Sequence, residues 1–340
     1  MARLGDYVKI KTGKLDANAS SENGQYPFFT CSVDPLRIDT YSYDCECVLV
    51  AGNGDLNVKY YNGKFDAYQR TYIIESKDKN ALTVPYLYCF LDGYVEELRK
   101  QSIGGVIKYI KLGNLTEAQI PICSIEKQNE IVENFDKVNT LISLRKQQLS
   151  KLDELVKSRF IEMFGDPIKN DKGLPTISGN RLFKLSNGKT LPDEKRLNSG
   201  IPAYGGNGIS WYTDEVLCDY DTIIVGRVGF QSGNVHYAKA PLWVTDNAMY
   251  LSELFIKDCE LGYLCALMEH IDFTRYQDAG DLKKITQKPF MQMLYLLPPH
   301  GQQKEFLRFV EQTDKSKSEI QKSLEKLETL KKALMQKYFG

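Results

Sequence analysis

The sequence has few of the side chains from which metal sites and catalytic centres are most often built. Its 340 residues include three histidines, His236, His270 and His300, and no two of them have the spacing of metal ligands. The His-Glu-x-x-His motif of zinc peptidases and the Gly-x-Ser-x-Gly motif of serine hydrolases are both missing. We therefore expect no catalytic residue, no metal site and no cofactor bound by this chain itself.

Paired cysteines and long apolar runs are missing as well. The eight cysteines include no Cys-x-x-Cys pair, and this favours free thiols in a reducing cytosol over zinc ligands or disulfides. No apolar run approaches ~18 residues, so no membrane-spanning helix is expected. The first residues, Met1–Asp6, lead into polar sequence rather than into a secretory signal. These features together predict a cytoplasmic protein.

The chain also lacks an excess of charge of either sign. Lysine and arginine number 44, aspartate and glutamate number 44, and the formal net charge is zero. A typical DNA-binding domain is strongly basic. Any face that binds nucleic acid must therefore be a local patch on an otherwise balanced surface.

What the sequence does contain is an internal repeat. Residues 1–165 and 176–340 follow one plan at an offset of 175 positions, and Lys157–Gly165 lies over Lys332–Gly340. Other positions match in the same way: Gly13-Lys14 with Gly188-Lys189, Pro27 with Pro202, Gly54 with Gly229, Gln128 with Gln303 and, after a two-residue slip, Asn57-Val58 with Asn234-Val235. Repeats in solenoid proteins run roughly 20–50 residues, so this longer repeat indicates a duplicated domain.

Each copy begins with short β-rich runs and ends in one long helix. The first copy has runs at 48–51, 58–61 and 72–74 and predicts a helix from Val84 to about Gln101. The second has runs at 222–225, 235–237 and 249–251 and predicts a helix from Glu260 to about Tyr276. The predicted fold class is α+β, with two mixed α/β domains joined by two long helices. The predicted divisions are 1–124 (first mixed domain), 125–165 (first long helix), 166–299 (linker and second mixed domain) and 300–340 (second long helix).

The two long helices show a coiled-coil rhythm. Apolar residues recur at spacings of three and four, with Glu and Lys between them. An alternative is that each helix lies as a core helix on its own domain, although nearly forty residues is far above the mean helix length. We expect the two helices to pair antiparallel, with a seam made by these residues: Ile142, Leu149, Leu152, Leu324, Leu327 and Leu334. Leu330 belongs to the same apolar spacing of the second helix.

Several local stretches resemble the DNA-specificity (S) subunit of type I restriction-modification systems. Gly200–Ile209 looks like that family's opening signature in a target-recognition domain, and Asp221–Gly229 followed by Ser232–Val235 looks like a second signature. The first copy carries looser versions at 24–29 and 47–54. The starts of the long helices, at 125–132 and 301–306, resemble the start of the family's spacer helices. The resemblance covers the whole chain, and the order of these stretches, twice over, makes it specific.

The resemblance implies a non-catalytic subunit that recognises double-stranded DNA. Each mixed region would be a target-recognition domain that reads one half of a split site. The paired helices would set the distance between the half-sites, at most about 17 base pairs for a helix of roughly 57 Å. They would also dock two methyltransferase subunits, which bind S-adenosylmethionine, methylate adenine and supply much of the phosphate contact. Restriction subunits that use ATP and Mg²⁺ can join such a complex.

Basic and amide residues in the mixed regions are the candidates for DNA contact, and loops that carry both glycine and lysine can approach phosphate closely. They are Lys14, Lys59, Arg70, Lys108, Lys189, Asn207, Arg227, Lys283 and Lys284. Arg227 occupies the repeat position of Gly52, so the two domains need not read the same bases. The outer faces of the long helices are the candidates for methyltransferase docking, through Phe135, Leu141, Leu155 and Phe160.

Two other functions fit parts of the sequence. Two like domains on a coiled coil also describe a protein-binding adaptor that has no DNA role. An enzyme with an unrecognised site is a further alternative, which the missing motifs disfavour. Sequence-specific DNA binding in the presence of a methyltransferase partner distinguishes the main interpretation from the adaptor.

Overall fold

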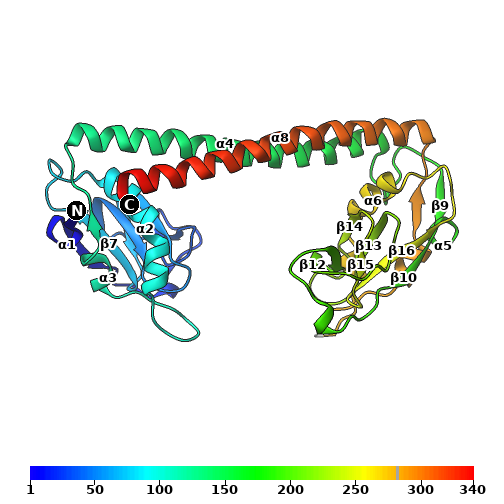
Figure 1. Cartoon of the computed structure of the whole chain (residues 1–340), viewed down its shortest axis with the longest axis horizontal. Coiled ribbons are helices and arrows are strands. Elements are labelled where there is room, and N and C mark those ends of the chain that lie inside the picture. Colours follow the sequence, from blue (N-terminus) through cyan, green and yellow to red (C-terminus); the bar gives the residue numbers. More distant parts are fainter. Residues whose placement is uncertain (281–282) are drawn as a thin grey trace. The chain divides into compact units, whose positions relative to one another are not determined.

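The computed structural model of the chain describes residues 1–280 and 283–340, and it contains two compact units. Unit 1 consists of Met1–Lys146 with Gln321–Gly340, and unit 2 consists of Gln147–Ile320. The long helices α4 (Ile125–Phe164) and α8 (His300–Phe339) therefore contribute one end to each unit (Figure 1). Each unit is described by itself below.

Unit 1 is built on a sheet with the strand order β2-β7-β5-β6-β3-β4, in which all neighbours are antiparallel except β3 and β6. The strands are β2 (Val8–Thr12), β3 (Tyr26–Phe29), β4 (Leu36–Ile38), β5 (Tyr43–Ala51), β6 (Val58–Ala67) and β7 (Thr71–Ser76), with β1 (Ala2–Arg3) paired to β8 (Gln119–Ile120). The helices are α1 (Leu4–Tyr7), α2 (Val84–Gln101) and α3 (Leu112–Thr116). The predicted helix from Val84 to Gln101 is confirmed; Thr83 caps it by accepting a hydrogen bond from the Tyr86 amide at 3.4 Å.

The central strand β5 is buried on both faces of this sheet. Val48 and Val50 point into the main core with α2, while Cys47 and Leu49 point into a second cluster with Phe65. Because successive side chains of a strand alternate between faces, a run that is apolar at every position covers two cores at once. The continuous apolar run at 47–51 is thus explained.

Unit 2 has the corresponding sheet order β10-β16-β13-β14, together with a smaller sheet of order β12-β11-β15. Its strands are β9 (Thr176–Ser178), β10 (Phe183–Asn187), β11 (Ile201–Gly205), β12 (Gly208–Thr213), β13 (Thr222–Gly226), β14 (Val235–Ala238), β15 (Trp243–Val244), β16 (Ala248–Leu254) and β17 (Leu294–Leu296), the last paired to β9. Its short helices are α5 (Gly179–Leu182), α6 (Leu261–Glu269) and α7 (Lys288–Gln292).

The second predicted short helix is too long by comparison with the structure. α6 ends at Glu269, and Phe273–Tyr276 forms a separate 3₁₀ turn. The Asp272 side chain accepts a hydrogen bond from the Thr274 amide at 3.1 Å and so starts this turn afresh. The apolar spacing continues across the break, which is why periodicity alone joined the two pieces.

The repeat is reproduced strand by strand. The order β2-β7-β5-β6 in unit 1 matches β10-β16-β13-β14 in unit 2, and a parallel strand pairing occurs at the same place in both units. That pairing joins Phe28 to Asp66 in unit 1 and Ala203 to Trp243 in unit 2. The predicted α+β fold with an internal repeat and long paired helices is confirmed.

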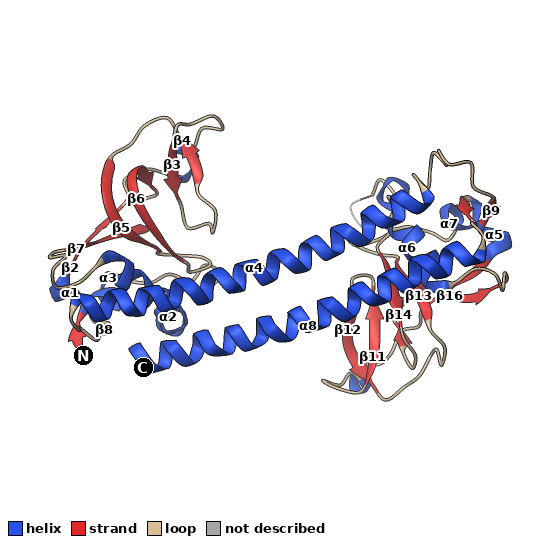
Figure 2. Ribbon diagram, turned by 90° about the horizontal axis from the view of Figure 1, so that it is seen from above, coloured by secondary structure: helices blue, strands red, loops and turns tan. Residues whose placement is uncertain are grey.

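The long helices run antiparallel within each unit (Figure 2). In unit 1 the Arg145 Nε donates to the Ser323 Oγ at 3.2 Å, and in unit 2 Lys317 pairs with Asp153 at 2.6 Å and Glu305 with Arg159 at 2.9 Å. The start of each helix thus lies beside the end of the other. Of the predicted seam, Leu324 is buried, and Ile142, Leu149, Leu152, Leu327 and Leu334 are partly buried. Leu330 is instead 46% exposed, because it lies on the outward side of α8.

A buried glutamine fastens the first turn of each long helix to its unit. In unit 2 the Gln303 Nε2 donates to the carbonyl oxygens of Asp258 and Pro298, at 3.0 and 2.9 Å, and its Oε1 accepts from the Glu260 amide at 2.9 Å. Gln128 makes the same three bonds in unit 1, to Ala81, Cys123 and Thr83. Both side chains are fully buried. Each therefore satisfies three backbone groups at the joint between the long helix and its unit.

Candidate nucleic-acid interface

Backbone hydrogen bonds gather four loops of unit 1 at one end of its sheet. The amides of Gly13 and Gly52 donate to the carbonyls of Thr71 and Arg70, at 3.0 and 2.8 Å. The Gly54 amide donates to the carbonyl of Lys108 at 2.9 Å. Three predicted DNA-contact residues, Lys14, Arg70 and Lys108, are thereby carried by loops that meet at this end. Residues between them, including Gly52, Gln69 and Arg70, line a hollow of 260 Å³.

Unit 2 gathers the equivalent loops by equivalent bonds. The Arg227 amide donates to the Asn247 carbonyl at 2.9 Å, as the Gly52 amide does to the Arg70 carbonyl. The Gly229 amide donates to the Lys283 carbonyl at 2.8 Å, as the Gly54 amide does to the Lys108 carbonyl. The backbone amide of Lys189 donates to the Val244 carbonyl, as the backbone amide of Lys14 donates to the Ala67 carbonyl. The repeat therefore includes the loop end of each sheet. We call these two sets of loops the loop ends of unit 1 and unit 2.

The predicted contact residues differ in how available they are. Those that are exposed are Lys14, Arg70, Lys108, Lys189, Asn207 and Lys284. Arg227 and Lys283 are partly buried, and the Arg227 Nη1 donates to the carbonyl of Asp246 at 3.1 Å. Lys59 is the least available, because its ammonium donates to the Asn57 side chain of its own turn and burial lowers its pKa. As contacts to DNA, all nine remain predictions.

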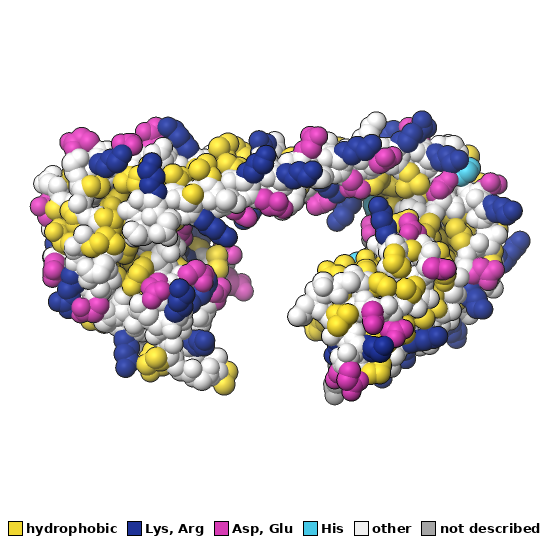
Figure 3. Space-filling model, viewed as in Figure 1, with side chains coloured by type: hydrophobic (Ala, Val, Ile, Leu, Met, Phe, Trp, Pro, Cys, Tyr) yellow, Lys and Arg dark blue, Asp and Glu magenta, His cyan; other side chains and the backbone are white. Residues whose placement is uncertain are grey.

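Carboxylates are interspersed with these cations. Asp246 lies beside Arg227 and accepts from the Thr190 hydroxyl at 3.2 Å, and Asp16 accepts from Gln69 at 2.6 Å in unit 1. Basic and acidic side chains alternate over the visible face of both units (Figure 3). The loop ends thus offer cations, amides and backbone at glycines without a strongly positive electrostatic potential, which is consistent with the balanced composition. Such groups suit selective contacts to base edges and phosphates better than broad electrostatic attraction.

The sequence reasoning missed the apolar side chains at the loop ends. Phe230 is 93% exposed, and Val106 and Ile107, next to Lys108, are also exposed. The signal for Phe230 was present in the two-residue slip of the repeat. That slip falls in the loop between β13 and β14, which spans 227–234, whereas the loop between β5 and β6 spans 52–57.

The proposed docking residues on the long helices require a correction. Phe135 and Phe160 are 1% and 0% exposed, and they pack in the cores of unit 1 and unit 2. They therefore cannot form an outer surface, because each unit covers the helix face that carries them. Leu141 and Leu155 are exposed, at 43% and 47%. Leu330, 175 positions after Leu155, is exposed to nearly the same extent, so the repeat presents one outward leucine of this kind in each unit.

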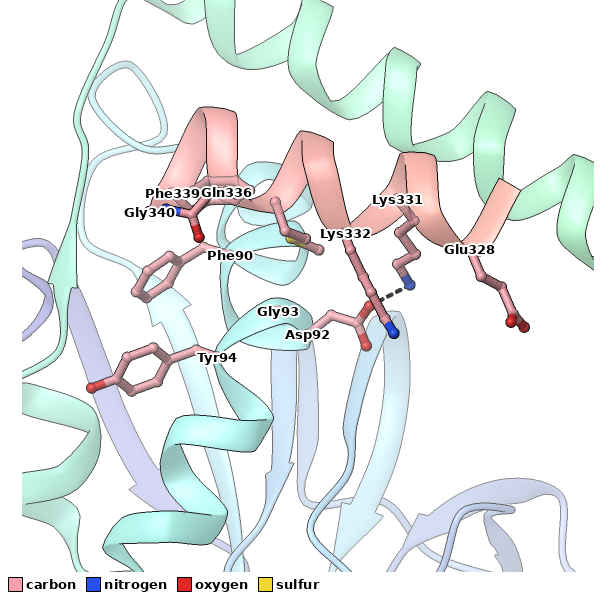
Figure 4. Close-up of a pocket in the computed structure, with 11 residues that line it drawn as sticks. Phe90, Asp92, Gly93, Tyr94, Glu328, Lys331, Lys332, Gln336, Phe339 and Gly340 are labelled. Carbon is pink, nitrogen blue, oxygen red and sulfur yellow. Dashed lines mark hydrogen bonds and ion pairs between the residues drawn. The ribbon is translucent and has the colours of Figure 1, made fainter. Parts of the chain in front are cut away.

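A hollow of 550 Å³ lies in unit 1 between α2 and the last turns of α8 (Figure 4). Phe90 and Tyr94 project from α2 on one side, and the Lys331 ammonium pairs with Asp92 at 2.9 Å near the other. At Gly93 a Cβ would clash with the sulfur of Met335. The equivalent positions of unit 2 carry His270 and Phe160, whose rings stack at 4.1 Å, and a hollow of 500 Å³ lies beside them. The repeat therefore also places a groove at the same joint of each unit.

Features of other protein classes are not found in the described parts of the chain. Within residues 1–280 and 283–340, no helix has the length and apolar character needed to span a lipid bilayer. Among the same residues, no group of three or more His, Cys, Asp or Glu side chains is placed to hold a metal ion. The eight cysteines are free thiols.

Comparison with known proteins gives a consistent family. Residues 1–154 and 180–332 match the family model for the type I restriction modification DNA specificity domain. The chain is 27% identical, over 392 aligned positions, to the type I restriction enzyme EcoDI specificity subunit of Escherichia coli, covering 99% of this chain and 86% of that protein.

Solved structures show the same fold. The crystal structure of the type I restriction-modification S subunit from Mycoplasma genitalium superposes with a TM-score of 0.66 at 18% identity, covering 100% of this chain and 95% of the other. A structure described as the basis of complex assembly and conformational transition of the type I restriction-modification system gives a TM-score of 0.59 at 14% identity, covering 99% and 96%. Both similarities concern the fold.

Proposed function

The chain belongs to the family of type I restriction-modification DNA specificity domains, and from this premise we propose that it is the DNA-recognition and scaffold subunit of a type I restriction-modification complex. The observation that carries the proposal is the family match over both copies of the repeat. The role is non-catalytic. The coiled-coil adaptor without a DNA role is not supported, because the matched relatives are specificity subunits.

Each unit would read one half of a split DNA site through its loop end. The equivalent backbone bonds in the two units support equivalent docking, whereas the side chains they present differ, as at Gly52 and Arg227. Sequence is read by hydrogen bonds and apolar contacts to base edges, so different side chains on one frame would give two different half-sites. The helices shared by the units would fix the gap between the half-sites.

The partners would be two methyltransferase subunits. The support is the duplication itself: Leu155 and Leu330 are outward at the same repeat position, and each unit has a groove at the joint between its short helix and a long helix. Two like surfaces on one chain suit two copies of one partner. S-adenosylmethionine would be bound by those partners, and ATP with Mg²⁺ by a restriction subunit, so the complex would work in the cytoplasm, where its DNA lies.

The proposal is tested by mapping DNA methylation. The chain is co-expressed with the methyltransferase subunit encoded beside it in a host without DNA methylation, and N6-methyladenine is mapped by single-molecule sequencing. We expect one split motif, with two short specified halves around a fixed gap. The methyltransferase expressed without this chain is the control and should leave the motif unmethylated. An assembled complex that binds S-adenosylmethionine but methylates no motif would refute the proposal.

Substitution of the outward leucines should change the stoichiometry of the complex. Aspartate at Leu155 or at Leu330 would place an unpaired charge in an apolar contact, at a cost of ~3–5 kcal/mol or more than ~100-fold in affinity. We expect each single variant to bind one methyltransferase subunit and the double variant to bind none, as measured by light scattering of the purified complex. The control is Leu144→Asp, since Leu144 is 49% exposed but its repeat counterpart is Glu319. Two bound subunits in the double variant would contradict the docking assignment.

A further inference from the structure

Phe230 is a phenylalanine that unit 2 holds almost entirely in solvent. It is 93% exposed, whereas most other phenylalanines of the unit, such as Phe160 and Phe290, are fully buried. Single apolar residues on a surface need no special explanation. Phe230, however, lies in the segment by which the β13–β14 loop is longer than its counterpart in unit 1. The ring is thus an addition to the loop end of unit 2.

Hydrogen bonds stabilise the base of the loop that carries Phe230. Its backbone bonds include the amide of Gly226 to the carbonyl of Asn234 and the amide of Gly233 to the carbonyl of Gly226, both at 2.8 Å. The Gln277 side chain donates to the carbonyl of Ser232 at 2.7 Å. Gly229 and Gly233 have positive φ angles, 87° and 95°, which favour glycine. The ring is therefore presented by a preorganised loop, and ordering it on binding would cost little.

The surroundings of Phe230 suit DNA better than a protein bound to the helices. Arg227 precedes it in the same loop, and the Gly229 amide bonds to the backbone of Lys283. Gly226 lies at the base of the loop and pairs with Ala248, the first residue of β16. The joint to α8, at Asp258 and Glu260, follows the other end of β16. A strand of seven residues separates these ends by roughly 20 Å.

We propose that Phe230 is an apolar wedge that inserts between neighbouring base pairs in the half-site read by unit 2. An aromatic ring on a rigid loop, flanked by cations that hold phosphates, can unstack one base step and bend the duplex there. The specificity of unit 2 then depends on how easily that step opens as well as on direct base contacts. This inference rests on the proposed function.

The test uses the full chain in complex with its methyltransferase subunits and two DNA duplexes. One carries the split motif found by methylation mapping, and the other has the unit 2 half scrambled. A 2-aminopurine base in that half, away from the methylated adenine, reports unstacking by its fluorescence. The variants are Phe230→Ala, Phe230→Trp and the control Phe255→Ala. Phe255 is 44% exposed, and its amide bonds to Leu182 at the opposite end of the same sheet.

We expect Phe230→Ala to bind the specific duplex about 10-fold or more weakly, from the loss of one stacked base contact, and to lose the 2-aminopurine signal. Its affinity for the scrambled duplex and its salt dependence should not change, because no phosphate contact is removed. Phe230→Trp and Phe255→Ala should behave like the unmodified chain. Equal affinity of Phe230→Ala and the unmodified chain for the specific duplex would overturn the wedge. So would weaker binding without any 2-aminopurine signal from the unmodified chain, which would indicate a contact in the groove instead. An unmodified complex that cannot distinguish the two duplexes would overturn the proposed function, and the wedge with it.

Discussion

Replacement of Gln303 by leucine is expected to lower the free energy of unfolding of unit 2 by about 3 kcal/mol or more. The reason lies in what the substitution leaves behind. The carbonyls of Asp258 and Pro298 and the amide of Glu260 would lose their partner at the buried Gln303 position, and a polar group left unsatisfied away from water costs roughly 1–3 kcal/mol. Leucine is similar in size to glutamine, so a cavity is not the main effect. The measurement is chemical denaturation followed by tryptophan fluorescence, because both tryptophans, Trp211 and Trp243, lie in unit 2.

The neighbouring Gln302 provides the matched control. Its side chain is exposed, so Gln302→Leu should shift the unfolding free energy by less than about 0.5 kcal/mol. A Gln303→Leu variant as stable as Gln302→Leu would show that water or a rearranged backbone satisfies the three groups. It would also remove the reason for glutamine at this position in both units, since Gln128 makes the same three bonds.

The buried glutamine at the start of each long helix shows which structural features a sequence repeat can predict and which it cannot. The match of Gln128 with Gln303 was visible without a structure, as were the long helices and the β-rich runs, because these depend on local spacing. What the spacing could not show was the purpose of the glutamine. The groups it satisfies lie 45 residues away in the chain, at Asp258, and 43 away, at Glu260. Contacts of that range depend on how the helix meets its domain, which no local pattern specifies.

The same limit explains the errors at the candidate surfaces. A coiled-coil pattern divides a helix into a seam and an outside, and it assigns Phe135 and Phe160 to the outside. In the structure both rings pack against the other long helix, Phe135 on Phe339 and Phe160 on Phe306, within the cores of their units, so both residues are buried. Leu330 was misplaced in the opposite direction, since its three-and-four spacing fits a seam although α8 turns it toward solvent. At the loop ends, lysines beside glycines were found from matching positions of the repeat, whereas Phe230 depended on reading the two-residue slip as an insertion.

Replacement of Phe160 by alanine is expected to destabilise unit 2 by about 3–5 kcal/mol, since it removes a fully buried ring and leaves a cavity. The ring joins three helices. It stacks on His270, which caps the end of α6, at 4.1 Å, meets Phe306 of α8 edge-on at 5.5 Å and lies 5.1 Å from Phe164 of its own helix. Such aromatic pairs contribute ~0.5–1.5 kcal/mol beyond their buried area. Tryptophan-monitored denaturation of unit 2 measures the loss.

Ile161→Ala is the control. Ile161 is the next residue of α4 but is 43% exposed, so the comparison distinguishes the effect of burial from the effect of any substitution at this point of the helix. It should cost well under 1 kcal/mol, since little apolar area leaves the interior. The comparison also decides what lost methyltransferase binding would mean. If Phe160→Ala both unfolds unit 2 early and weakens partner binding, the binding loss follows from the loss of structure. If it weakens partner binding while the unfolding free energy of unit 2 stays within about 1 kcal/mol of the unmodified chain, Phe160 contacts the partner directly. The core around Phe160 must then rearrange when the partner binds, so that the ring becomes accessible.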